Sequence, residues 1–472
     1  MQMREFHIVS RLGKTRVWKI GVQGDQVVTE FGELGGKMQR VADTGQEKNV
    51  GRSNYVSPEK AAIEQMERQI LKQTRSGYVE LGSEGAKITS FEEMDLSKDL
   101  PGNLRFYKPD NSLSKRMEKM LEKGDAWLSR KRDGEMVVIF LPIGAEYPVI
   151  YSRNMLKHHH LEEDSEWSHR FTHICDEIYN DFGEIPGGTL LLGEMVSGPE
   201  LDDRWKIATI MKTLTPESIK FQEEHGKAHF CCWDIAFWGG EDWVSTLTIR
   251  ERYQTIHKMF DGARFIVPVE HYAADEIEDG LSAFWDARYD DTWREEYDKM
   301  EADGTIKAQA MLFAKIQDWE GFVVIDPDGE YGDSAYNFRG KTDRPGKYCC
   351  KLKPLYDDDF IAFFDPEGTH TGEVSGKWGR GKRQGQVGSV ALYQYDSSGV
   401  MHYICDCGGG IIKTDEFAEE FSDPALYPLV VEVLYNGRTF KSKGDDTNAL
   451  QFPRVSRVRH DKEADECINE EL

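Results

Sequence analysis

The sequence predicts a multidomain α+β protein, and three observations about its organisation lead to this prediction. Its 472 residues are long enough for two to four domains, each with its own core. Strand-like runs accompany one clear helix in residues 1–95, whereas apolar strand runs and helical patches alternate in residues 96–355. Residues 356–472 contain short strand-like runs between glycine turns, a spacing that suggests a small barrel.

The first segment is expected to form a small α+β module. Strand-like runs cover residues 6–9 and 17–22, and glycine-rich turns follow them. A helix is predicted to start with Ser57 as its N-cap and a proline at its first position. Gly77 is placed to end this helix.

The other two segments are predicted mainly from apolar runs. A short helix is expected around residues 113–121 and is ended by Gly124. Strands are predicted at residues 136–141, 189–196, 229–237, 321–325, 348–352, 388–393, 402–405 and 429–434. We expect any hinge between the second and third segments to lie between Pro354 and Asp359.

Composition and charge describe a soluble globular protein, with 39% hydrophobic and 30% charged residues. A net charge of −25 argues on its face against a nucleic-acid partner, but the acid is concentrated between Asp275 and Asp303. A DNA contact needs a basic stripe rather than a basic protein. Such a stripe is predicted at Lys377, Arg380, Lys382 and Arg383, although a solvated surface is the alternative.

Cellular location is inferred from what the sequence lacks. We expect no membrane association, because no run of apolar residues is long enough to span a bilayer and the N-terminus lacks a secretory core. The eight cysteines include no Cys-x-x-Cys pair, which argues against a structural zinc site. The expectation is therefore a monomer in a reduced cytoplasm, bacterial or of a virus-infected cell.

The tetrapeptide Lys131-Arg132-Asp133-Gly134 is the most informative feature of the chain, and an apolar strand-like run follows it. A lysine so placed can attack the α-phosphate of a nucleotide and carry the nucleotide covalently. A free lysine amine has a pKa of about 10.4. We therefore expect burial and nearby cations to favour its neutral, nucleophilic form. The alternative is a chance match on a surface turn.

Further motifs follow Lys131 in a fixed order. They are Ser152-Arg153-Asn154, Gly193-Glu194, Trp233-Asp234, Glu320-Gly321, Lys351-Leu352-Lys353 and Arg459-His460-Asp461-Lys462. This order resembles the nucleotidyltransferase motif series of ATP-dependent DNA ligases and covers most of the chain. The resemblance implies a nucleotidyltransferase (ATP-grasp-like ligase) domain of antiparallel sheets and helices in residues 96–355.

The resemblance also implies roles for individual residues. Lys131 would be the nucleophile, Lys351 and Lys353 would supply positive charge at the α-phosphate, and a second pair of cations would orient the leaving pyrophosphate. That second pair is Arg459 and Lys462. Glu320 and Glu194 would hold the divalent metal. The nucleotide would be contacted by Asp133, Gly134, Arg153, Glu194, Trp233 and Arg344.

Three places depart from the family pattern. Ser129 stands where an acid often recognises adenine, and Met136 stands where an arginine often follows the glycine. Neither Arg344 nor Lys347 aligns cleanly with the basic residue that usually precedes the Lys-x-Lys pair. These departures concern the purine contacts and leave the phosphate chemistry intact.

Both ends of the chain carry further resemblances. Two segments near the C-terminus resemble the OB-fold domain of DNA ligases: Gly381-Lys-Arg-Gln-Gly-Gln-Val-Gly388 and the residues from Phe452 to Arg459. This resemblance implies a C-terminal OB-fold β-barrel. The stretch from Phe31 to Gly36 is similar to WGR-type DNA-end-binding modules, although Phe31 and Glu33 replace the usual Trp and Arg. A generic module docked on the enzyme is the alternative for residues 1–95.

The predicted activity is that of an ATP-dependent DNA ligase that seals nicks in double-stranded DNA with ATP and Mg²⁺, or with Mn²⁺ in its place. Alternatives within the superfamily are an mRNA capping guanylyltransferase and an RNA ligase. The absence of a zinc-finger cysteine set disfavours an NAD-dependent ligase. An alternative from another class is a DNA-end-binding protein without catalytic activity.

Overall fold

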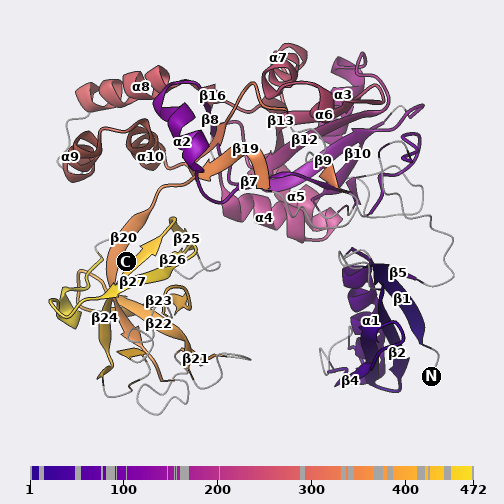
Figure 1. Ribbon diagram of the computed structural model, residues 1–472, viewed down its shortest axis with the longest axis horizontal. Helices are drawn as coiled ribbons and strands as arrows, with labels where there is room; N and C mark the ends of the chain where they lie inside the picture. The colour runs from indigo at the N-terminus through magenta and orange to yellow at the C-terminus, as the bar shows by residue number, and fades with distance from the viewer. Residues whose placement is uncertain are drawn as a thin grey trace.

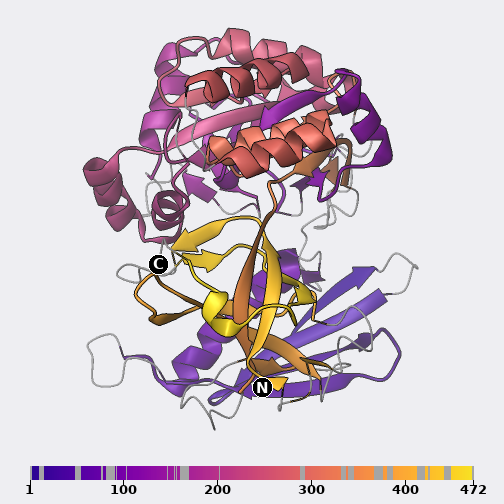
Figure 2. The same cartoon turned by 90° about the vertical axis from the view of Figure 1, so that its left-hand side faces the viewer.

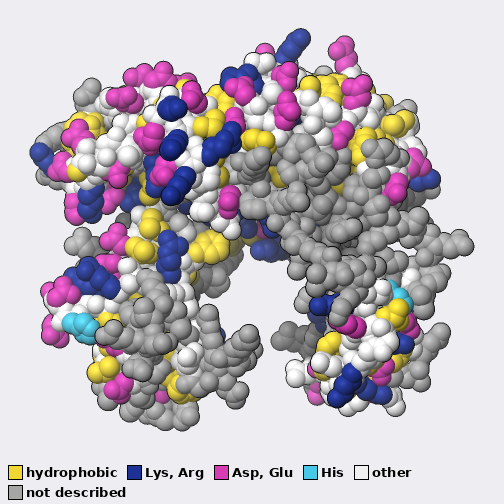
Figure 3. Space-filling view, in the orientation of Figure 1, with side chains coloured by type: hydrophobic (Ala, Val, Ile, Leu, Met, Phe, Trp, Pro, Cys, Tyr) yellow, Lys and Arg dark blue, Asp and Glu magenta, His cyan; other side chains and the backbone are white. Residues whose placement is uncertain are grey.

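The computed structural model has a mixed α+β architecture with several sheets, arranged in three lobes (Figure 1). The sequence correctly predicted this class. The structure describes residues 3–9, 15–47, 55–75, 78–80, 91, 93–102, 104–145, 147–153, 155, 157–159, 170–200, 202–287, 293–330, 336–337, 345–365, 376–379, 386–411, 420–421, 423, 426–440 and 448–469. Figure 2 shows the first and third lobes both lying below the central lobe, and Figure 3 shows them standing apart.

The first lobe is a five-stranded antiparallel sheet with one helix against it, in the order β4-β3-β2-β1-β5. The elements are β1 (Arg4–Val9), β2 (Thr15–Gln23), β3 (Gln26–Glu33), β4 (Gln39–Thr44), β5 (Val79–Glu80) and α1 (Pro58–Arg75). The Ser57 hydroxyl accepts a hydrogen bond from the Lys60 amide, so the predicted N-cap is confirmed. Trp18 and Ile20 of β2 pack against Ala62 of α1.

The central lobe contains two larger sheets. The first sheet has seven strands: β9 (Glu135–Leu141), β10 (Val149–Ser152), β11 (Lys157–His159), β12 (Thr189–Val196), β13 (His229–Trp238), β14 (Glu241–Asp242) and β15 (Ile266–Pro268). The second has five: β7 (Lys108–Asp110), β8 (Trp127–Arg130), β16 (His271–Tyr272), β17 (Phe322–Ile325) and β19 (Pro345–Leu352). A small ribbon pairs β6 (Arg105–Phe106) with β18 (Tyr336–Asn337).

An apolar core joins these two sheets face to face. It brings Val138 and Leu192 of the first sheet together with Val323 and Cys349 of the second. The outer face of the first sheet is covered by α3 (Thr172–Asp181), α4 (Arg204–Lys212) and α5 (Thr215–His225). The helices α6 (Trp243–Thr246) and α7 (Ile249–Met259) contribute to this outer core and also to the core between the sheets. The outer face of the second is covered by α2 (Lys115–Glu122), α8 (Ala274–Ala287), α9 (Arg294–Asp303) and α10 (Ile306–Ile316).

The prediction of antiparallel sheets is incomplete. Two pairs are parallel: β13 with β15, and β19 with β7. In each pair a short edge strand, β15 or β7, is separated from its partner by a long connection, and such a connection is what parallel neighbours require. The predicted strands at 136–141, 189–196 and 229–237 correspond closely to β9, β12 and β13.

The third lobe is built mainly from one sheet in the order β21-β22-β20-β24-β27, with β23 beside β22. Its elements are β20 (Tyr356–Phe363), β21 (Lys377–Trp378), β22 (Val387–Tyr395), β23 (Met401–Cys407), β24 (Leu429–Tyr435), β25 (Arg438–Phe440), β26 (Asn448–Leu450), β27 (Arg454–Val458) and the 3₁₀ turn Ala464–Glu466. A single bridge joins Gly409 to Arg454. Among the described residues the strand ladders do not close on themselves, so the predicted closed barrel is not confirmed.

Two further observations concern the chain as a whole. All eight cysteines are free thiols. Within the described ranges, no helix is long and apolar enough to cross a membrane.

A buried ion pair fixes α7 against β13 in the central lobe. Arg252 and Asp234 are 0% and 2% exposed, and the Arg252 Nε lies 2.6 Å from the Asp234 Oδ1. The Tyr107 hydroxyl donates to the other carboxylate oxygen at 2.7 Å. Since both charges are buried, each depends on the other for compensation.

We predict that Arg252→Met destabilises the protein by about 3–5 kcal/mol, because it leaves the Asp234 carboxylate buried without its cation. Thermal unfolding followed by circular dichroism measures the loss. Arg250→Met is the control on the same helix, since the Arg250–Asp328 pair is exposed and its loss should cost about 0–1 kcal/mol. Equal effects of the two variants would contradict the prediction.

Candidate active site

Lys131 lies where the chain passes from one central sheet to the other. It follows the last residue of β8, and the loop 131–134 leads into β9. The Lys131 amide donates to the Gly321 carbonyl at 2.9 Å, which ties the loop to the start of β17. Gly134 packs directly against β12, where an added Cβ would lie 2.3 Å from the Met195 carbonyl oxygen. Only glycine permits this close approach, and it brings the loop beside Glu194.

Glu320 joins two of the predicted lysines. One of its carboxylate oxygens accepts a hydrogen bond from the Lys131 Nζ, and the other accepts one from the Lys353 Nζ. The three side chains are between 12% and 18% exposed, so these are largely buried ion pairs. The structure thus brings Lys131, Glu320 and Lys353 together, although they come from three separate segments of the sequence.

The charge balance at Lys131 differs from the expectation. Burial lowers the pKa of Lys131, as expected, but the charges of Glu194, Glu320 and Asp133 outweigh burial and raise the pKa above its usual value. The expectation rested on neighbouring cations, whereas three acids converge on Lys131 in the structure. Among the protein's own groups, Lys131 is therefore held as an ammonium ion.

The acids around Lys131 are themselves perturbed. Burial, with repulsion from Glu320, raises the pKa of Asp133 to about 6 and that of Glu194 to about 7. Burial also acts to raise the pKa of Glu320, but Lys131 and Lys353 outweigh it and hold that pKa below its usual value. These carboxyl groups repel one another in a poorly solvated space, which is a setting that favours a divalent cation.

No group of three or more His, Cys, Asp or Glu side chains within the described ranges is arranged to hold a metal by itself. Mg²⁺ commonly binds through one or two carboxylates together with waters and substrate phosphates. The donor set of Glu320 and Glu194, with Asp133 nearby, fits that kind of site.

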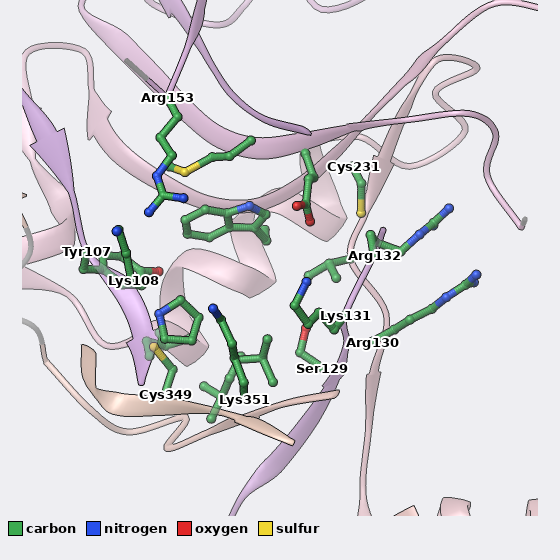
Figure 4. A pocket seen from close by; sticks show the side chains of 18 residues that line it. Tyr107, Lys108, Ser129, Arg130, Lys131, Arg132, Arg153, Cys231, Cys349 and Lys351 are labelled. Carbon is green, nitrogen blue, oxygen red and sulfur yellow. The ribbon is translucent and has the colours of Figure 1, made fainter. Parts of the chain in front are cut away.

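A pocket of about 210 Å³ opens beside Lys131 (Figure 4). Its apolar wall is formed by residues of both central sheets, namely Met136, Trp233, Val323 and Ile325, with Ile249 of α7. The ring of Tyr107 meets the Trp233 ring edge-on, with 5.5 Å between centroids. A flat apolar wall of this kind suits a planar ring system.

Cations surround the same pocket. Figure 4 shows Lys108, Arg153 and Lys351 pointing into the space beside Tyr107. Burial lowers the pKa of Lys351, and the charges of Lys131 and Lys353 lower it further. The Lys351 Nζ contacts the Asn111 Oδ1 at 3.1 Å. The arrangement can bind a ligand that has both an aromatic ring and negative charge.

Tyr107 and Lys108 line the pocket but were not predicted from the sequence as site residues. The aromatic and basic run from Phe106 to Lys108 was the available signal, but nothing in the sequence indicates that β7 pairs with β19 next to Lys351. Ser129 and Met136, the two departures from the family pattern, both line the pocket.

Other predicted residues lie outside this pocket. Arg459 and Lys462, in the third lobe, both form ion pairs with Asp359 of β20, at 2.8 and 2.9 Å. Lys377 pairs with Asp406 at 2.9 Å. The predictions for Arg344, Arg380, Lys382 and Arg383 fall outside the described residues.

Comparison with known proteins gives one significant sequence match. No protein-family model matches the chain. A DNA ligase of Methanococcus maripaludis is 28% identical over 158 residues, which cover 30% of this chain and 24% of that protein. The match is consistent with the covalent nucleotidyltransferase superfamily. The chain therefore spans about a quarter of the length of this curated relative.

Solved structures similar to the chain are more distant. A structure named Pmar-Lig_PreS3 has a TM-score of 0.48 and 19% identity, and the match covers 75% of this chain and 68% of that one. The ATP-dependent DNA ligase of bacteriophage T7 in complex with ATP has a TM-score of 0.34 and 16% identity, with 75% and 98% covered. An RNA ligase of Naegleria gruberi has a TM-score of 0.27 and 12% identity, with 74% and 95% covered.

The raised pKa of Glu194 gives a prediction about stability and pH. The pKa of Glu194 is raised to about 7 in the folded protein, whereas the ordinary pKa of a glutamate is 4.5. Between these values the folded state binds more protons than the unfolded state, so stability falls as pH rises. Glu194→Gln removes this loss, and its melting temperature relative to wild type should be higher at pH 8 than at pH 5.

The control is Glu184→Gln, which changes an exposed glutamate. Its melting temperature relative to wild type should not change between the two pH values. If Glu194→Gln behaves in the same way as this control, Glu194 does not carry a raised pKa.

Proposed function

We propose that the protein is an ATP-dependent DNA ligase that seals 5′-phosphate/3′-hydroxyl nicks through a lysyl-AMP intermediate. The observation that carries the proposal is the position of Lys131. Its side chain is bonded to Glu320 beside an apolar pocket, and Lys351 lines the same pocket. A nucleophile, acids that fit a metal, and cations that fit a phosphate are thus adjacent.

In the first step the Lys131 amine would attack the α-phosphorus of ATP. The ammonium group of Lys131 first loses a proton to water, the new bond then joins Nζ to phosphorus as the bond from phosphorus to the pyrophosphate oxygen breaks, and a second proton passes from Nζ to water. Lys351 and Lys353 lie near Lys131 and would balance the negative charge of the phosphate. Trp233 would stack on the adenine and Arg153 would reach the ribose or a phosphate.

Mg²⁺ or Mn²⁺ held by Glu320 and Glu194 would neutralise acids that raise the pKa of Lys131. Burial and Lys351 would then dominate the environment of the amine, and both favour its neutral form. Glu320 would orient the amine through the hydrogen bond that it accepts.

In the second step AMP would pass to the 5′-phosphate at the nick, and in the third the 3′-hydroxyl would expel AMP. We propose residues 1–95 as a WGR-like DNA-binding module, 96–355 as the nucleotidyltransferase domain and 356–472 as an OB-fold domain. The bridge between Gly409 and Arg454, which brings the end of β23 to β27, supports a barrel-like third domain. Monomeric enzyme in a bacterial or virus-infected cell would act in DNA replication, repair or recombination.

Lys131→Ala tests the proposal directly. The wild type should form a covalent adduct with α-labelled ATP that is acid-labile and alkali-stable, and the variant should form none. The variant should still seal a nick that already carries AMP, because the third step does not use the lysine as a nucleophile. Lys212→Ala, which changes an exposed lysine of α4, is the control and should behave as wild type.

Other outcomes decide between the alternatives. An adduct with GTP and not ATP would indicate a capping guanylyltransferase, and sealing of RNA strands alone would indicate an RNA ligase. Absence of any adduct on the wild type would leave a DNA-end-binding protein. An adduct on Lys131→Ala would show that another residue is the nucleophile.

Lys462→Ala tests whether the third domain closes on the nucleotide in the first step and opens for the later steps. Lys462 is paired with Asp359 rather than with pocket residues, so its proposed role at pyrophosphate requires this movement. The variant should lose self-adenylylation and keep sealing of pre-adenylylated nicks. Alanine at Lys377, Arg380, Lys382 and Arg383 should do the reverse and weaken nick binding with a steep salt dependence.

The two variants are compared in separate assays of the first and third steps. If both lose the same step to the same degree, the domain movement is not part of the mechanism.

A further inference from the structure

The segment between β12 and α4 forms hydrogen bonds and ion pairs with the loop that carries Lys131. Its central residue is Asp202, whose side chain is 7% exposed. Asp202 Oδ1 accepts from the Arg132 Nε at 2.9 Å, and Asp202 Oδ2 lies 3.6 Å from the Arg130 Nη2. The Asp133 amide donates to the same Oδ2 at 3.2 Å. One carboxylate therefore contacts residues on both sides of Lys131.

The rest of the segment, together with Arg204 at the start of α4, adds contacts to the same loop. Arg132 donates to the carbonyls of Gly198 and Pro199, each at 2.8 Å. Arg130 donates to the Glu200 carbonyl. Arg204 donates to the Gly134 carbonyl and, at 2.9 Å, to the Glu135 carboxylate. The loop is thus held along its length by residues 198–200, Asp202 and Arg204.

These contacts hold the side chains of Arg130 and Arg132 on one side of the loop, apart from the side chain of Lys131. Figure 4 shows Arg130 and Arg132 extending together, away from Lys108, Arg153 and Lys351. The two arginine side chains are 4% and 3% exposed, so they have little freedom to move. Among the described residues, the side-chain hydrogen-bond partner of Lys131 is Glu320.

We propose that Asp202 is a positioning residue that fixes the direction of the Lys131 amine for attack on the nucleotide. The inference rests on the proposed function and extends it to a residue that does not touch the nucleotide. Efficient attack requires the reacting atoms to be held about 3–3.5 Å apart and in line, and a misplacement of about 1 Å can cost about 100-fold in rate. Three contacts to the neighbours of Lys131 give Asp202 that control.

The test compares Asp202→Asn with Asp203→Asn. Asp203 is the N-cap of α4 and accepts from the Lys206 amide at 2.8 Å, a role that asparagine also fills. Both variants lose one negative charge at adjacent positions. We expect Asp202→Asn to slow self-adenylylation at saturating ATP by about 100-fold. The ATP concentration at half-saturation should change little, and sealing of pre-adenylylated nicks should stay as in wild type. Asp203→Asn should match wild type in all three.

A double variant distinguishes a loss of catalytic rate from a loss of stability. Asp202→Asn leaves the buried Arg132 without its carboxylate, whereas Arg130 keeps its ion pair with Glu270 at 3.3 Å. Adding Arg132→Gln removes the uncompensated buried charge. The double variant should recover the melting temperature and remain slow in self-adenylylation.

Each outcome decides a point. An equal loss of the first and third steps in Asp202→Asn, with recovery of both in the double variant, would mean a purely structural role and overturn the inference. An unchanged rate in Asp202→Asn, with a normal adduct on the wild type, would overturn the inference alone. Absence of an adduct on the wild type would overturn the proposed function and this inference with it.

Discussion

The ion pairs of Glu320 are the contact on which the rest of the site depends. Its carboxylate binds the side chains of Lys131 and Lys353, and the Gly321 carbonyl beside it binds the Lys131 backbone. These contacts join the ends of β8, β17 and β19. The three strands of the second central sheet are therefore held together at the place where the chemistry is proposed. Removing this carboxylate would take the hydrogen-bonded partner from two largely buried cations, which is costly in a poorly solvated site.

The pocket itself follows from the packing of two sheets. Their shared core excludes water over most of the interface, and the pocket opens where the connection from β8 to β9 crosses from one sheet to the other. The low polarity of this place raises the pKa values of Asp133 and Glu194. The fold therefore creates the electrostatic conditions of the site before any ligand is considered.

Much of the fold could be predicted where local composition is decisive. β12 was predicted at its observed bounds, because a strand buried on both faces is apolar along most of its length and does not alternate with polar residues. The helix α2 was predicted within two residues, and its Ser114 cap is seen in the structure. The helices α8 and α9 were not predicted as elements, because their many acids obscure the apolar residues that pack against the second sheet. Strand closure in the third lobe depends on pairings that local patterns do not encode.

The candidate site shows the same limit in chemical terms. Motif order placed Lys131, Glu320 and Lys353 in one site, and the structure brings these residues together. The sequence predicted a lowered pKa for Lys131, and this prediction was wrong. The shift depends on how many acids converge on the lysine from three separate segments of the chain. Asp202 had no sequence pattern that connects it to Arg130 and Arg132, since such contacts exist only after β12 and β8 are placed.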